Sequence, residues 1–212
     1  MNETLGLLET FGLTPMLAAI DVMEKSGAVQ ILQCELNDLG GVAAKVVGPM
    51  AAVESALANA RMTAEKLGGR PVATLLARPD PEAQKAIHSP PTFNPLIEQD
   101  VVFFPIDEPA ARAAFRESAM NESPFALGFI ETQGFTAVFE AIDTACKAGH
   151  VEIVGKEKLG GGYVAVIIKG DLAAVTAAIE AGKEKVNGLG KLIAAHVLAR
   201  PSPAVLALLP KG

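Results

Sequence analysis

The sequence is short of aromatic and reactive side chains. Its 212 residues include no Trp, one Tyr and two Cys, and aromatic residues make up 5% of the chain. Cys34 and Cys146 occupy unrelated positions without a CxxC spacing, so they indicate neither a metal cluster nor a disulfide framework. We therefore expect two buried free thiols.

Long basic and long apolar runs are also missing. The net charge is -6 and no Lys/Arg run stands out, so the sequence does not have the electrostatic pattern that binds nucleic acid. Apolar runs such as 163–168 fall well below the roughly 18 to 20 residues that cross a bilayer. No secretory signal is visible at the N-terminus. We expect a cytoplasmic protein that contacts neither nucleic acid nor membrane.

No pattern of catalytic or metal-binding residues stands out. The histidines His88, His150 and His196 lie on different expected elements without an i, i+4 partner, so a metal site is not indicated. Glu9 and Glu131 recur at matching strand ends, which suggests either a carboxylate pair for acid–base catalysis or a repeated structural hydrogen bond. The duplication favours the structural role, because a catalytic site needs one asymmetric constellation. We expect no enzyme activity, no metal and no cofactor.

Small aliphatic residues are what the chain has in abundance. Hydrophobic residues make up 50% of the sequence, and the mean hydropathy is +0.33 although aromatics are few. Large apolar patches are rare on soluble monomers. This composition predicts extensive contact between subunits.

The chain is an internal duplication. Residues 5–79 recur 122 positions later as 127–201 without a gap, and 29 of the 75 aligned positions are identical. Such self-similarity determines the architecture before any local pattern does. We expect a first domain over 1–80, a connector with short helices over 81–124, and a second domain over 125–212.

Each copy has the element order β-α-β-β-α-β, which predicts an α+β, ferredoxin-like antiparallel sheet with two helices on one face. The first copy gives strands 4–10, 29–35, 42–47 and 72–77, and helices 13–26 and 49–67. The second gives strands 126–132, 151–157, 163–169 and 192–199, and helices 135–148, 172–186 and 203–208. The connector gives helices 80–88 and 109–119, with Asp107 as N-cap of the latter, and an extended piece over 101–104. Asp171 is the expected N-cap of its helix.

A glycine-rich turn joins the middle strands of each copy, at 37–41 and at 158–162. A phosphate-binding loop is one interpretation of the second turn, but it joins two strands and does not match GxxxxGK[ST]. The Asn, Asp and Gly residues favour tight β-turns.

Both copies resemble the bacterial microcompartment shell domain. The second copy carries the motifs ALGFIET, AIDTACKAG, VEIVGKEKLGGGYVAVIIKGD and AAHVLARP, and the first keeps LGLLET, AIDVMEKSG and LLARP. Two such domains resemble the tandem shell proteins, whose trimers are shaped like hexagons and tile an organelle shell. Each copy begins with its LGxxET strand, so the resemblance is to the unpermuted class.

The resemblance implies particular roles. It implies a homotrimer that assembles with other shell proteins in the shell of a microcompartment and passes small polar metabolites through a central pore. The pore-lining residues it implies are Asn37, Asp38, Leu39, Gly40, Lys158, Leu159, Gly160 and Gly161. The tile-edge residues it implies are Lys25, Arg78, Lys147 and Arg200.

Three of these assignments have alternatives. Asp38 either caps its own turn or places a charge at the pore. Lys25 and Lys147 are either solvated cations at helix ends or edge contacts. Some tandem relatives hold an iron-sulfur cluster at the trimer axis through a cysteine, so a ligand-sensing or redox module is the alternative function, although here Asp38 occupies that aligned position.

Overall fold

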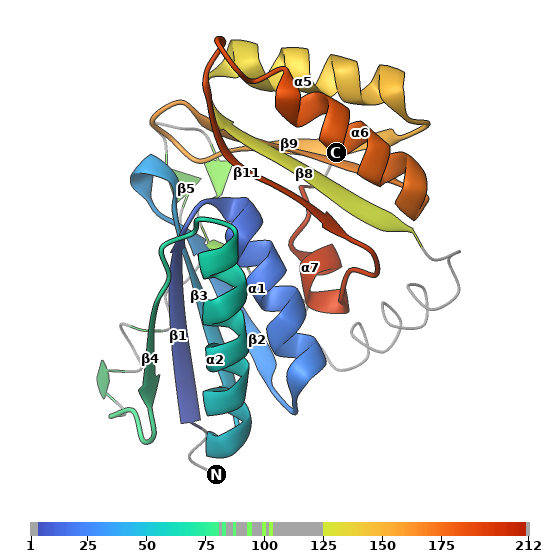
Figure 1. Ribbon diagram of the computed structural model, residues 1–212. Helices are drawn as coiled ribbons and strands as arrows, with labels where there is room; N and C mark the ends of the chain where they lie inside the picture. Colours follow the sequence, from blue (N-terminus) through green and yellow to red (C-terminus); the bar gives the residue numbers. More distant parts are fainter. Residues whose placement is uncertain are drawn as a thin grey trace.

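A computed structural model describes residues 4–80, 82–83, 87, 93–94, 99–100, 102–103 and 125–210. It contains two units with the same order of elements, each an antiparallel sheet with two helices on one face (Figure 1). The first unit consists of β1 (Thr4–Phe11), α1 (Leu13–Ser26), β2 (Gln30–Leu36), η1 (Asp38–Gly40), β3 (Gly41–Gly48), α2 (Met50–Lys66) and β4 (Val72–Leu76). The second consists of β8 (Ala126–Gln133), α5 (Phe135–Ala148), β9 (Glu152–Lys158), β10 (Tyr163–Gly170), α6 (Leu172–Glu184), β11 (Lys191–Leu198) and α7 (Pro203–Ala207).

The predicted fold class is confirmed. Strands follow one another as β4-β1-β3-β2 in the first unit and β11-β8-β10-β9 in the second, which is the ferredoxin-like order. Helices α1 and α5 have the predicted bounds. Asp171 caps α6, because its Oδ1 accepts a hydrogen bond of 2.9 Å from the backbone N–H of Ala174.

The connector contributes to the first sheet, which the sequence did not predict. Strand β7 (Val102–Phe103) pairs antiparallel with β2, so this sheet has five strands. Strands β5 (Phe93–Asn94) and β6 (Gln99–Asp100) form a separate pair. In the predicted helix 80–88, the described residues 82–83 and 87 are helical. The predicted helix 109–119 and its N-cap lie outside the described residues.

Helices and strands approach closely because glycine faces aliphatic side chains at equivalent positions. A Cβ added to Gly6 would lie 2.7 Å from Val53, and one added to Gly128 would lie 2.7 Å from Val175. Contacts this short do not occur between real side chains, so α2 and α6 sit directly on β1 and β8. The duplication therefore preserves the packing as well as the topology.

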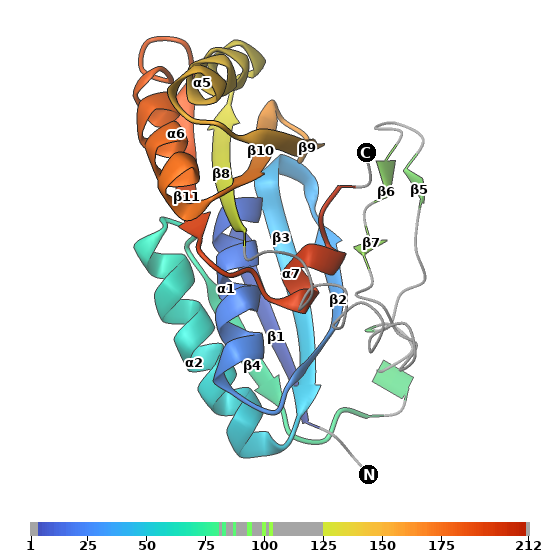
Figure 2. The same ribbon diagram turned by 90° about the vertical axis from the view of Figure 1, so that its right-hand side faces the viewer.

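The two units meet along a contact that we call the junction. Helix α1 of the first unit packs against β8, β11 and α7 of the second (Figure 2). One buried cluster crosses this boundary: Leu13 and Leu17 belong to it from α1, and Leu127 and Phe129 from β8. The face of the second sheet that α5 and α6 leave open is thus covered by the first unit of the same chain.

Candidate functional site at the junction

The two glycine-rich turns lie side by side. The backbone N–H of Gly40 donates to the carbonyl oxygen of Leu159 at 3.2 Å. A Cβ added to Gly161 would lie 2.8 Å from Leu39 Cδ2. The sequence placed these two turns next to each other only through the family resemblance, and the structure brings them together at one end of the junction.

Backbone conformation explains the glycines of the second turn. Gly160, Gly161 and Gly162 have φ values of 74°, 58° and 83°, a region that side chains other than glycine rarely occupy. A hydrogen bond of 3.0 Å from the Tyr163 N–H to the Gly160 carbonyl oxygen closes the turn. The turn between two strands that the sequence favoured is confirmed.

Exposure differs between the two turns. In the first turn, Leu39 has φ 62° and its side chain is 65% exposed. In the second turn, Leu159 is 2% exposed. An aromatic pair packs behind the turns, with the rings of Phe11 and Tyr163 edge to face at 5.2 Å. The turns therefore present backbone groups and the apolar side chain of Leu39 to solvent, and the Phe11–Tyr163 pair supports them from behind.

Glu131 forms the central polar contact of the junction. Its carboxylate is fully buried and accepts hydrogen bonds from the backbone N–H of Leu13 at 2.9 Å and of Thr14 at 2.8 Å. These are free N–H groups of the first turn of α1, where a carboxylate also favours the positive end of the helix dipole. Burial raises the pKa of Glu131, and the two N–H groups oppose that rise.

Gly12 leaves room for this carboxylate. It has φ 98°, and a Cβ there would lie 3.2 Å from Glu131 Oε2. The structural hydrogen-bond role favoured for Glu131 is confirmed, whereas Glu9 is exposed at the matching position. The sequence could not give the partner of Glu131, because it belongs to the other unit.

A second set of polar contacts lies at the other end of the junction, around Asp21. Asp21 Oδ2 accepts from Lys25 Nζ at 2.6 Å and Asp21 Oδ1 accepts from the backbone N–H of Ser202 at 2.8 Å. Lys25 also donates to the carbonyl oxygen of Arg200. Burial lowers the pKa of the nearby His196, and the charge of Asp21 partly opposes this.

Of the four predicted edge residues, the structure brings two together. Lys25 and Arg200 meet at the junction, whereas Lys147 pairs only with Asp143 in its own helix within the described part of the chain. Arg78 is exposed at the end of the first unit. Both lysines pair with an aspartate one turn earlier, so they are helix-end cations, and the tile-edge role stays a prediction.

Lys45 is a buried charge that sequence analysis missed. It is 8% exposed, and its Nζ donates to Gln33 Oε1 at 2.7 Å and to Glu35 Oε1. The second unit has Ile167 at this position, which is fully buried in the cluster that crosses the junction. At this position, on the face that its own helices leave open, the first sheet therefore carries a charged side chain and the second sheet an apolar one.

The prediction of two buried thiols is half wrong. Cys34 is buried, and burial raises its pKa to about 12. Cys146 is exposed, because it lies on a side of α5 that no described residue covers. Neither cysteine is in a disulfide.

The described residues contain no cluster of three or more His, Cys, Asp or Glu side chains placed to hold a metal ion. Across the same residues, no helix combines the length and the apolar character that spanning a membrane requires.

Comparison with known proteins agrees with the duplicated fold. The BMC domain family matches twice, over residues 4–78 and 126–201. The shell protein PduA of Citrobacter freundii is 47% identical over 87 residues, which are 41% of this chain and 94% of PduA. The carboxysome shell protein CcmK2 of Thermosynechococcus vestitus is 46% identical over 90 residues, covering 41% of this chain and 87% of its own length. A solved microcompartments protein from Desulfitobacterium hafniense DCB covers 95% of this chain and 97% of its own, with 24% identity and a TM-score of 0.37.

The two matches show that the chain carries two BMC domains, one in each unit of the fold. The chain belongs to the BMC-domain family. PduA and CcmK2 are shell proteins, and each corresponds in length to one of the two units. A structural role in a microcompartment shell is the function that these relatives support.

Proposed function

We propose that the chain is a shell tile of a bacterial microcompartment and not an enzyme. Three copies close into a ring of six similar domains with an opening at the centre. The chain acts in the cytoplasm, within the shell and beside other shell proteins. Its partners are copies of itself, neighbouring tiles and the small molecules that cross the opening.

The observation that carries this proposal is the meeting of the two glycine-rich turns. In one chain, the Gly40 N–H and the Leu159 carbonyl join equivalent ends of two equivalent domains. If the rotation that relates the first unit to the second is repeated about one axis, all such turns meet at that axis. Each chain supplies two units, so three chains supply the six units of the ring.

The proposed pore is lined by these turns. Its residues are Asn37, Asp38, Leu39 and Gly40 from the first unit, and Lys158, Leu159, Gly160 and Gly161 from the second. Backbone amides and small residues at a constriction favour small polar molecules over bulky apolar ones. Three copies of Asp38 disfavour anions through like-charge repulsion.

The proposed outer edges carry Lys25, Arg78, Lys147 and Arg200. The chain ends helices α1 and α5 with the same lysine and aspartate pair. A plate with repeated edges needs the same contact at each side. Such contacts do not close on themselves, so they extend into a layer.

The alternative redox role has less support. Cys34 is the cysteine closest in sequence to the first turn, and it is 2% exposed within the cluster that crosses the junction. Its pKa of about 12 disfavours the thiolate, which is the form that binds metal.

Cryo-electron microscopy of the purified chain tests the proposal. We expect two-dimensional class averages of a flat six-lobed plate with a central hole. Co-expression with a one-domain shell protein should then give closed shells that contain this chain. Particles without threefold symmetry, together with absence of the chain from purified shells, would overturn the proposal.

A further inference from the structure

The two units differ in how their edge strands are paired. Strand β2 is the last of the first unit's own strands, and β7 of the connector continues that sheet, with Phe103 opposite Cys34 and Val102 opposite Glu35. Strand β9 has the equivalent place in the second unit, and no described strand pairs with its outer edge. Among the described residues, one unit therefore has a filled strand position and the other an open one.

The backbones of β2 and β9 are bulged at the same place. On β2, the pairing with the next strand skips one residue between Ile31 and Gln33. On β9, it skips the equivalent residue, between Ile153 and Gly155. Because a bulge bends its strand locally, the two edges bend alike. The place beside β9 that corresponds to the place of β7 therefore suits an added strand in the same way.

The side chains along the two edges differ. Cys34 of β2 is 2% exposed, whereas the equivalent Lys156 is exposed, with its Nζ 5.6 Å from the centre of the Phe139 ring. Further along the strands, Ile31 is 4% exposed and the equivalent Ile153 is 53% exposed. The edge of β9 thus combines a cation with an exposed apolar side chain.

We propose that β9 binds an extended segment of another protein, which adds to the second sheet as β7 adds to the first. The segment runs antiparallel to β9. It carries an acidic residue opposite Lys156, with β-branched or aromatic residues on either side. This inference goes beyond the shell role, because the edge of β9 is present in a single chain.

Backbone hydrogen bonds supply the attraction, and side chains supply the selection. An edge strand presents a row of N–H and C=O groups with which an extended peptide can pair. Between residues that face each other in an antiparallel pair, opposite charges stabilise the pairing and like charges destabilise it. Lys156 therefore favours an acidic segment over a neutral or basic one.

The chain's own connector does not have this chemistry. On β7, Phe103 faces the buried Cys34. The same residue placed on β9 would face the charged Lys156 instead. The connector of a second copy is therefore a poorer partner for β9 than an acidic segment of another protein.

The bound segment lies beside the glycine-rich turns. Strand β9 ends at Lys158, where the second turn begins, and β2 ends at Leu36, directly before the first turn. In the proposed tile, three β7 strands and three bound segments alternate around the opening. The site thus holds a partner protein next to the pore.

Fluorescence anisotropy of labelled peptides with the full-length chain tests the proposal. The probes are a peptide of residues 99–105 and its Phe103→Glu and Phe103→Lys variants, which differ only in the residue that would face Lys156. We expect the glutamate peptide to bind most tightly, with an affinity about fivefold above that of the lysine peptide.

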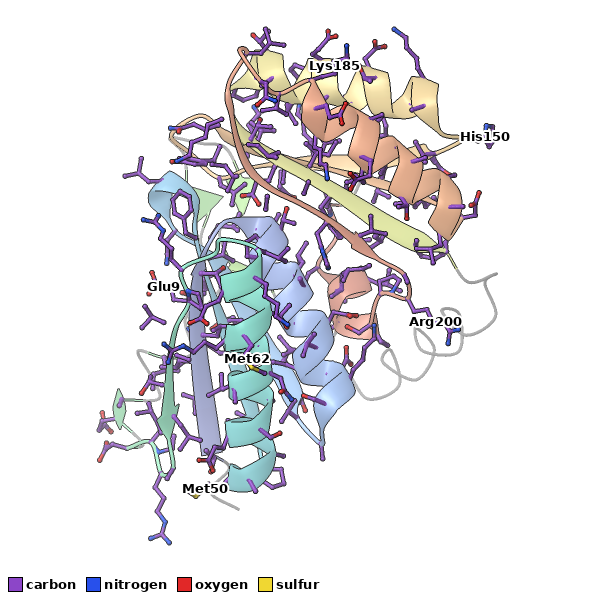
Figure 3. The ribbon with its side chains drawn as sticks, in the orientation of Figure 1. Glu9, Met50, Met62, His150, Lys185 and Arg200 are labelled. Atoms are coloured by element: carbon purple, nitrogen blue, oxygen red, sulfur yellow. The ribbon has the colours of Figure 1, made fainter. Side chains whose placement is uncertain are left out.

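Two variants of the chain locate the binding. Lys156→Glu should reverse the preference, so that the lysine peptide binds most tightly. Lys185→Glu at the end of α6 (Figure 3) changes the net charge by the same amount and should leave the preference unchanged. A peptide that displaces β7 from β2 faces Cys34, so neither variant would reverse its preference.

Methylation of the peptide nitrogens separates strand pairing from charge attraction. Only alternate residues of an antiparallel strand direct their N–H groups toward a given neighbour. Of two glutamate peptides methylated at the nitrogen of Val101 or of Val102, one should therefore lose binding and the other should keep it.

The outcomes bear on this site alone. Absence of saturable binding, equal effects of the two methyl groups, or a glutamate preference that Lys156→Glu leaves unchanged would overturn the proposal. Tightest binding of the unaltered 99–105 peptide would assign the edge to the connector of a second copy and overturn the partner proposed here. The trimeric tile is judged separately, by the symmetry of its particles.

Discussion

The carboxylate of Glu131 accepts a hydrogen bond of 2.9 Å from the backbone N–H of Leu13, a residue 118 positions earlier in the chain. One side chain of the second domain thereby completes the first turn of a helix in the first domain. The two copies of the duplication are therefore not independent units.

Removing the Glu131 carboxylate should destabilise the chain. Glu131→Ala leaves two buried N–H groups without an acceptor and a cavity beside Gly12, so we expect a loss of about 2 to 4 kcal/mol in the free energy of unfolding. Glu131→Gln keeps one acceptor but turns an NH₂ group toward the second N–H, so its loss should be smaller than that of the alanine variant.

Urea denaturation at a fixed protein concentration measures this loss. Glu54→Ala is the control, because it removes the same group from an exposed position on α2. Equal midpoints for Glu131→Ala and Glu54→Ala would show that the cap contributes nothing to stability.

Gly12 should be more sensitive to substitution than a glycine of similar conformation in open space. Gly12 and Gly188 have φ values of 98° and 82°, and only Gly12 has a carboxylate beside it. Alanine at either site costs about 1 to 2 kcal/mol in backbone strain. Gly12→Ala should lose more, because it also displaces Glu131, and thermal denaturation of the two variants measures the difference. A larger loss for Gly188→Ala would contradict the role given to Gly12.

Acidification should weaken the protein through His196. Burial lowers the pKa of this side chain below 6.5, so between the folded and unfolded values the unfolded chain binds more protons. His196 therefore costs no stability above pH 6.5, and its destabilising effect grows as the pH falls through 6.5 toward the folded pKa.

Replacing His196 isolates this effect from that of Glu131. The raised pKa of Glu131 acts in the opposite direction, because its folded form holds a proton more tightly and stability from this group is lost as the pH rises. We expect the melting temperature of His196→Gln to fall less between pH 7.5 and 5.5 than that of the wild type. Parallel curves would show that His196 does not titrate with folding.

The two cysteines should differ in reactivity. Cys34 is buried with a pKa of about 12, and Cys146 is exposed. Because the thiolate is the reactive form, a disulfide reagent such as Ellman's should label one thiol per native chain rapidly and the second only after denaturation. Cys146→Ser should abolish the rapid phase, and rapid labelling of two thiols in the native protein would contradict the buried position of Cys34.

Local pattern was enough to predict the fold. The spacing of apolar residues and the glycines that precede helices 13–26 and 135–148 gave the bounds of α1 and α5. The extended piece predicted over 101–104 contains strand β7, but its pairing with the edge of β2 escaped prediction, because two residues give no sign of the strand they join.

The junction could be predicted only in part. Glu9 and Glu131 stand in the same ET motif, yet one is exposed and the other is fully buried, since burial depends on a neighbouring domain. Cys146 was expected to be buried because free cysteines usually are, and the sequence could not show which face of α5 is covered. Lys45 gave no signal, because its partners Gln33 and Glu35 lie on the adjacent strand.

The mass of the native particle in solution tests the central claim most directly. Light scattering coupled to size exclusion should give three times the chain mass of 21.9 kDa over a wide range of concentrations. A particle with the mass of one chain, or of two, would contradict a ring in which the contact inside the chain is repeated between chains.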